Sequence, residues 1–296
     1  MKRILRLYVL FMVLFGAMAP LRAAIVTPIY AIARLSFVEE PYNRYQFGVF
    51  DLGSPTGSPG SYGYAWTSLG SSSAAPLANL ALNPVTSQMY LQYDFTEYRT
   101  ISTGGVIGGT SLGSMDTLFG MAFDNSGNLY GAHYDQWFTL NPATGTTITN
   151  TTMSDFLYSQ FGGNMAYASD GDFYFAASDP PDPLFNITAA GVDTMVGDFS
   201  GTNYDDTMSS VMFSSGVDSY LLNENRLYQV TLSNASLSLL GTVTGLPDEF
   251  NSGFSGAVGI ASAAPAAVPE PGTWAAAALL VGGAAFMRWR KRAKVS

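Results

Sequence analysis

Apolar triplets followed by polar turns recur along the middle of the chain. The triplets occupy residues 80–82, 121–123, 165–167 and 211–213. Each is followed by a turn of five or six residues rich in Asp, Asn, Ser and Gly, which are the residues that hairpin turns require. A residue pair ending in tyrosine then completes each pattern, at Tyr90, Tyr130, Tyr174 and Tyr220. The pattern therefore predicts four strand–turn–strand units.

Two further β-rich segments follow each of these units. The first contains an aromatic and an aliphatic residue, and lies at residues 98–101, 138–140, 185–187 and 228–230. The second lies at residues 106–113, 147–152, 193–199 and 237–244. Four short strands thus recur every 40 to 46 residues. That length and strand count are typical of a β-propeller blade.

The two ends of this region contain the parts of a fifth blade. Residues 257–260 resemble an isolated first strand, whereas residues 29–35, 47–50 and 64–69 resemble strands two, three and four. Closing the ring with strands from both ends would remove its exposed edge. The sequence predicts an all-β fold, a β-propeller of about five four-stranded blades closed by both termini, with a C-terminal transmembrane helix. An open solenoid and a β-sandwich are the less favoured alternatives.

Composition and charge narrow the functional classes. The chain has 296 residues, of which 12% are charged, and it lacks cysteine, so disulfide scaffolds, Cys-ligated zinc sites and thiol nucleophiles are excluded. Nine of the 13 Lys and Arg lie at the two ends, whereas all but one of the 22 acidic residues lie between Ala23 and Val268. Such an acidic body repels phosphate backbones, and we therefore expect no nucleic-acid partner.

The N-terminus has the pattern of a secretory signal peptide. Basic residues Lys2, Arg3 and Arg6 precede the short apolar run 7–19. Small residues allow cleavage after Ala19 or near Ala23, and the second is favoured because Pro20 follows the first. The sequence predicts a signal peptide at residues 1–23 and therefore an exported protein, with signal peptidase as its first processing partner.

The C-terminus has three consecutive parts. A Pro269-Glu270-Pro271 tripeptide precedes the apolar stretch 274–287, and a basic cluster follows. The apolar stretch predicts a short membrane-spanning helix, and the basic cluster is expected to stay cytoplasmic. The residues that form this cytoplasmic stop are Arg288, Arg290, Lys291 and Arg292. The body of the protein would then lie outside the cytoplasm.

This tail resembles the PEP-CTERM sorting signal of Gram-negative bacteria, which consists of a Pro-Glu-Pro tripeptide, a hydrophobic helix and an arginine-rich end. The resemblance implies processing near Val268, Pro269, Glu270 and Pro271 by an exosortase, a membrane transpeptidase. It also implies an inner-membrane-anchored precursor that passes to the cell surface or extracellular matrix of a biofilm-forming bacterium. The predicted parts are a signal peptide at 1–23, a propeller at 24–265 and a sorting signal at 266–296. A tail-anchored periplasmic protein is the alternative.

Candidate chemistry within the body is sparse. His133 is the only histidine, so multi-histidine metal sites are excluded, and we expect it to be an ordinary strand-end residue. The run 124–128 has alternating oxygen ligands but lacks the spacing of a calcium loop, and a hairpin turn is the expected structure. No cofactor is expected. A structural calcium ion remains an alternative in the loops that contain Asp179, Asp182, Asp205 and Asp206.

Aromatic residues cluster in the irregular first blade, at Tyr42, Tyr45, Tyr62, Tyr64 and Trp66. Core packing is the default interpretation, and a face that stacks on sugar rings is the alternative. An acidic exopolysaccharide is a candidate partner, with divalent cations bridging the carboxylates. The favoured function is a non-enzymatic surface or matrix protein with no catalytic residues. The alternative is an extracellular propeller hydrolase or lyase acting on a sugar or lactone, which would need carboxylates converging in the central channel.

Overall fold

The computed structural model describes residues 28–36, 43–154, 165–177, 182–201, 210–248 and 250–259. Every regular element in these ranges is a β-strand, so the predicted all-β class is confirmed. The chain divides into two units, Met1–Ile260 and Ala261–Ser296, and all described residues belong to the first. The predicted signal peptide and C-terminal helix lie outside the described residues.

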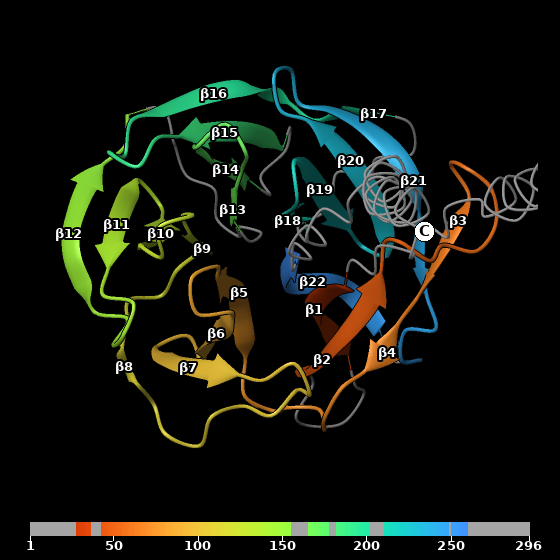
Figure 1. Ribbon diagram of the computed structural model, residues 1–296, viewed down its shortest axis with the longest axis horizontal. Helices are drawn as coiled ribbons and strands as arrows, with labels where there is room; N and C mark the ends of the chain where they lie inside the picture. The colour runs from red at the N-terminus through yellow and green to blue at the C-terminus, as the bar shows by residue number, and fades with distance from the viewer. Residues whose placement is uncertain are drawn as a thin grey trace, which may run out of the picture. The chain divides into compact units, whose positions relative to one another are not determined.

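The strands form five antiparallel blades arranged in a ring (Figure 1). Blade 1 consists of β22 (Phe250–Gly259), β1 (Pro28–Ser36), β2 (Asn43–Asp51) and β4 (Thr67–Ser68). Blade 2 consists of β5 (Leu77–Asn83), β6 (Gln88–Tyr93), β7 (Glu97–Ile101) and β8 (Gly113–Ser114). Blade 3 consists of β9 (Gly120–Phe123), β10 (Leu129–His133), β11 (Gln136–Leu140) and β12 (Thr147–Thr152).

Blades 4 and 5 complete the ring. Blade 4 consists of β13 (Met165–Tyr167), β14 (Phe173–Ala176), β15 (Pro183–Ile187) and β16 (Asp193–Asp198). Blade 5 consists of β18 (Ser210–Ser215), β19 (Asp218–Asn223), β20 (Arg226–Thr231) and β21 (Ser236–Thr244). Two short strands, β3 (Tyr62–Ala65) and β17 (Ser200–Gly201), pair with β21 in parallel and extend blade 5 at its outer edge.

The ring is closed by strands from the two ends of the body, as the sequence predicted. β22 pairs antiparallel with β1, and the register places Ala257 opposite Ala31. β1 then pairs with β2, and β2 pairs with β4. The innermost strand of blade 1 therefore comes from the end of the body, while its other three strands come from the beginning.

Two predicted fourth strands differ from the observed ones. Residues 64–69 do not form one strand, because β3 leaves blade 1 to pair with β21 of blade 5 while β4 stays with β2. Gly241 permits this pairing, since a side chain there would collide with the Tyr62 backbone. In blade 2, pairing in the predicted stretch 106–113 is reduced to a bridge at Ile107 and the start of β8. Glycines interrupt that stretch and weaken its tendency to form a strand.

The hydrophobic core consists of five clusters, one between each pair of neighbouring blades. The cluster between blades 1 and 5 joins Ile29 and Phe50 to Val211 and Leu227, so the closing interface is packed like the others. Close approach of the inner strands needs glycine: a Cβ on Gly120 would lie 2.8 Å from the Cβ of Met165. Each blade therefore depends on both neighbours for burial of its apolar faces.

An aromatic residue on the third strand of two blades packs beneath a turn of the next blade. The Tyr98 hydroxyl donates to the Pro142 carbonyl at 3.3 Å, and its ring lies against Gly145. The indole N–H of Trp137 donates to the Ala189 carbonyl at 3.2 Å, and its ring lies in the same way against Gly191, so two successive interfaces repeat one contact. Both glycines have positive φ, which other residues adopt at a cost.

Candidate functional site

Consecutive antiparallel strands place two kinds of loop at one end of the ring. The hairpins between second and third strands and the connections from one blade to the next lie at this end, which we call the loop end. At the loop end of blade 3, Phe119 precedes β9, His133 ends β10, and Tyr134 begins the β10–β11 hairpin. These three residues form what we call the ring cluster.

The three rings of the ring cluster contact one another. The ring centroids of Phe119 and His133 are 4.7 Å apart, and those of Phe119 and Tyr134 are 4.9 Å apart, both in edge-to-face geometry. The His133 and Tyr134 centroids are 4.3 Å apart. Tyr134 is 44% exposed although its backbone has a φ of 49°, a conformation that non-glycine residues adopt infrequently. Tyr134 therefore combines an exposed ring with an unusual backbone conformation.

Two carboxylates lie beside the ring cluster. Burial lowers the pKa of His133, and the negative charges of Asp116 and Asp135 act in the opposite direction. Both aspartates are exposed, and the effect of burial outweighs that of the two charges, so the pKa of His133 is lowered overall. The stretch 115–154, which includes all of blade 3, contains no Lys or Arg. The ring cluster is thus an aromatic surface with negative charge and no cation of its own.

A buried amide network fixes the segment that carries Asp116 and Phe119. Asn79 Nδ2 donates to Gln92 Oε1 at 3.0 Å and to the Leu118 carbonyl at 2.7 Å. Gln92 accepts from the Leu118 N–H at 3.3 Å and donates to the Asp116 carbonyl at 2.7 Å. Both amide side chains are buried. Blade 2 therefore positions one wall of the ring cluster in blade 3.

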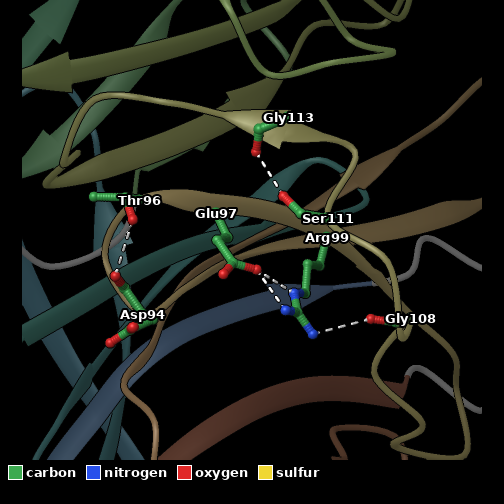
Figure 2. A network of polar contacts seen from close by, with 7 residues as sticks. All are labelled: Asp94, Thr96, Glu97, Arg99, Gly108, Ser111 and Gly113. Atoms are coloured by element: carbon green, nitrogen blue, oxygen red, sulfur yellow. Dashed lines mark hydrogen bonds and ion pairs between the residues drawn. The ribbon is translucent and has the colours of Figure 1, made fainter.

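At the loop end of blade 2, the position that matches His133 has a different arrangement. Tyr93 ends β6 as His133 ends β10. The Arg99 guanidinium lies 4.1 Å from the Tyr93 ring centroid. Figure 2 shows that Arg99 pairs with Glu97, at an Nε–Oε2 distance of 2.7 Å, and donates to the Gly108 carbonyl at 3.3 Å. Blade 2 thus covers its own aromatic ring with its own cation.

Sequence reasoning identified His133 but not the ring cluster. We expected an ordinary strand-end residue, and His133 does end β10. Phe119 and Tyr134 were not singled out, because their contact depends on pairing between β9 and β10. The string His133-Tyr134-Asp135 at a hairpin was the one available signal. Phe119 lies 14 residues before His133, and no sequence signal connects it to that hairpin.

The sorting-signal residues lie outside the described residues. This holds for Val268, Pro269, Glu270 and Pro271, and for the basic stop formed by Arg288, Arg290, Lys291 and Arg292. Within the described ranges, no helix is long and apolar enough to cross a membrane. Both predictions about the tail therefore stay predictions.

The structure describes only some of the candidate calcium ligands. Asp124 forms the expected hairpin turn, since its carboxylate accepts hydrogen bonds from the backbone of Ser126 and Asn128. Asp182 is buried, whereas Asp179, Asp205 and Asp206 lie outside the described residues. In the part of the chain that the structure describes, no three His, Asp or Glu side chains are grouped to hold a metal ion.

The aromatics of the first blade belong to the core. Tyr45, Tyr64 and Trp66 are buried, and Tyr62 packs against the same cluster as Tyr64 and Trp66. The default interpretation is confirmed for Tyr45, Tyr64 and Trp66, whose burial excludes them from a sugar-stacking face, whereas Tyr62 is partly buried. Tyr42 lies outside the described residues. Among the described residues, the exposed aromatic side chains are Phe95 and Tyr134, and both lie at the loop end.

The inner strands of the five blades are built from apolar residues together with Gly, Ser, Asn and one Tyr. These strands are β22, β5, β9, β13 and β18, and their described segments contain neither Asp nor Glu. Leu80, Met121, Met165 and Val211 from these strands are buried. The predicted mark of the enzyme alternative was a pair of carboxylates in the central channel, and none comes from these five strands.

Comparison with known proteins yields fold neighbours at low identity. No family model and no curated protein matches the chain. Virginiamycin B lyase from Staphylococcus aureus is 11% identical with a TM-score of 0.41, over 76% of this chain and 72% of that one. TolB from Acinetobacter baumannii is 12% identical with a TM-score of 0.45, over 77% of this chain and 56% of that one. A structure described as a putative gluconolactonase is 10% identical with a TM-score of 0.37, over 58% and 66%. The five-bladed fold rests on the strand pairing within this chain.

Proposed function

We propose that the chain is an exported, non-enzymatic propeller protein, anchored by its C-terminal segment and then processed by an exosortase for display at the cell surface or in the extracellular matrix. The signal-peptide pattern at residues 1–23 and the tripeptide Pro269–Pro271 support export and processing. The five blades, closed by the pairing of β22 with β1, support the propeller part of this proposal.

The position of the closing strand is the observation that carries this proposal. β22 ends at Gly259, and nine residues separate it from Pro269. Cleavage at the tripeptide would therefore leave all five blades intact, including the β22–β1 pairing that closes the ring. A sorting signal placed after a completed fold can be removed without unfolding the part that is delivered.

The test compares a host that has an active exosortase with an isogenic strain that lacks it. Mass spectrometry of protein released from the first strain should find a C-terminus near Val268 to Pro271, with residues 274–296 absent. Glu270→Ala should abolish that product, whereas Pro265→Ala, a matched change outside the tripeptide, should leave it unchanged. Recovery of only the intact tail from the exosortase strain would refute the proposal.

A further inference from the structure

Blades 2 and 3 differ in the groups that surround the aromatic residue at the end of their second strand. In blade 2, the ring of Tyr93 is covered by the Arg99 guanidinium, which Glu97 holds in place. Cations are attracted to the electron-rich faces of aromatic rings, and a planar guanidinium also stacks on them. The chain therefore contains its own example of an aromatic ring, a carboxylate and a guanidinium joined at the loop end.

Blade 3 has the ring and the carboxylates without the cation. His133 occupies the position of Tyr93, Phe119 and Tyr134 extend the aromatic surface, and Asp116 and Asp135 supply negative charge. The four arginines of the body lie at 34, 44, 99 and 226, none of them in blade 3. Each of the four is also at least partly buried within its own blade.

We propose that the ring cluster, with Asp116 and Asp135, is a docking site for an arginine side chain of a partner protein. The charges are complementary, because Asp135 directly follows Tyr134, Asp116 lies three residues before Phe119, and acidic residues far outnumber basic ones in the body. The ring of Tyr134 is 44% exposed, so it is accessible to an incoming planar group that can stack on it. This inference does not depend on export or on processing of the tail.

His133 can report on binding at the ring cluster without interference from another histidine. As the only histidine in the chain, it gives one imidazole signal in a histidine-selective carbon-13 NMR spectrum. A cation bound beside it opposes protonation of the imidazole, so the ligand should lower the pKa of His133 further. A neutral ligand on the same rings would shift the signal but would lack this electrostatic effect.

The experiment titrates the full chain, in a neutral detergent, with acetyl-arginine amide. All nine Lys and Arg of the two ends are replaced by Gln in every sample so that the chain's own ends do not compete. We expect a saturable shift of the His133 signal, a lowered His133 pKa, and binding at least fivefold tighter than that of acetyl-citrulline amide, which has the same shape without the charge.

Variants separate the ring from the charge. Tyr134→Leu should weaken binding about two- to fivefold, the range of an exposed cation–π contact, while Tyr134→Phe should retain it. Asp116→Asn combined with Asp135→Asn should weaken binding about as much and remove its salt dependence. Phe95→Leu is the matched control and should have no effect, because Phe95 is a hairpin aromatic of blade 2 with 47% exposure and a φ of 61°.

Three results would overturn the proposal. Equal binding of the arginine and citrulline amides would show that charge is irrelevant. Tight binding of a neutral glucose hexamer, unaffected by the two Asp→Asn changes, would identify a sugar-stacking surface instead. If the His133 signal shows no saturable shift although thermal unfolding shows that the sample is folded, the ring cluster binds no cation.

Discussion

Replacing Gln92 by methionine tests whether the buried amide network holds the loop end of blade 3 in place. The methionine side chain has nearly the same length but makes none of the three hydrogen bonds that Gln92 forms with Asn79, Leu118 and Asp116. Two buried donors, Asn79 Nδ2 and the Leu118 N–H, would each lose a partner, at about 1 to 3 kcal/mol apiece. Burial of the apolar methionine offsets a fraction of that loss.

The expected loss is therefore about 3 kcal/mol in the free energy of unfolding. For a domain of this size, that corresponds to a decrease of about 6 to 12 °C in the melting temperature. Circular dichroism followed during thermal and urea unfolding measures both quantities. Gln229→Met is the control, since Gln229 is exposed and donates to Asp218 at the surface; we expect a change within about 0.5 kcal/mol.

A double-mutant cycle isolates the contact between the two amides. Asn79 has a φ of 48°, so Asn79→Gly removes the amide without adding backbone strain. If the two amides form one network, the losses from Asn79→Gly and Gln92→Met should fall short of additivity by about 1 kcal/mol. Equal losses for Gln92→Met and Gln229→Met, or strict additivity in the cycle, would refute the reasoning.

Further predictions concern the blade interfaces, closure of the ring and pH. Gly145→Ala should destabilise the protein by about 1 to 3 kcal/mol more than Gly60→Ala, as measured by urea unfolding. Both glycines have positive φ, but only a Cβ at position 145 would lie 2.7 Å from a packed tyrosine side chain. Deleting residues 256–262 should lower the melting temperature strongly, whereas ending the chain before Val268 should leave it nearly unchanged; similar melting temperatures would contradict closure by both ends. Because burial lowers the pKa of His133 in the folded state, its contribution to stability is fully present above pH 6.5 and decreases as the pH falls below that value; denaturant titrations at several pH values should show His133→Gln lacking this dependence.

The sequence by itself predicted the class of fold and a ring of about five blades. The turn that follows each apolar triplet depends on local sequence, because hairpin geometry restricts φ and side-chain type within a few positions. The period of 40 to 46 residues between these turns is therefore visible without any knowledge of long-range contacts. The isolated strands near the two ends also predicted the closing pair β22 and β1. The export and sorting signals are equally local patterns, and they stay predictions.

Only the tertiary structure decided which strand leaves its own blade to pair with the next one and which aromatic residues reach the surface. The move of β3 to blade 5 depends on Gly241 admitting the Tyr62 backbone, a contact between residues far apart in the sequence. Tyr64 and Trp66 are buried, and Tyr134 is exposed, although all are aromatic residues in or beside strands. The difference arises from packing between blades, which the local alternation of residues does not encode. Phe119, His133 and Tyr134 meet for the same reason, since strand pairing within blade 3 and the amides of blade 2 set their positions together.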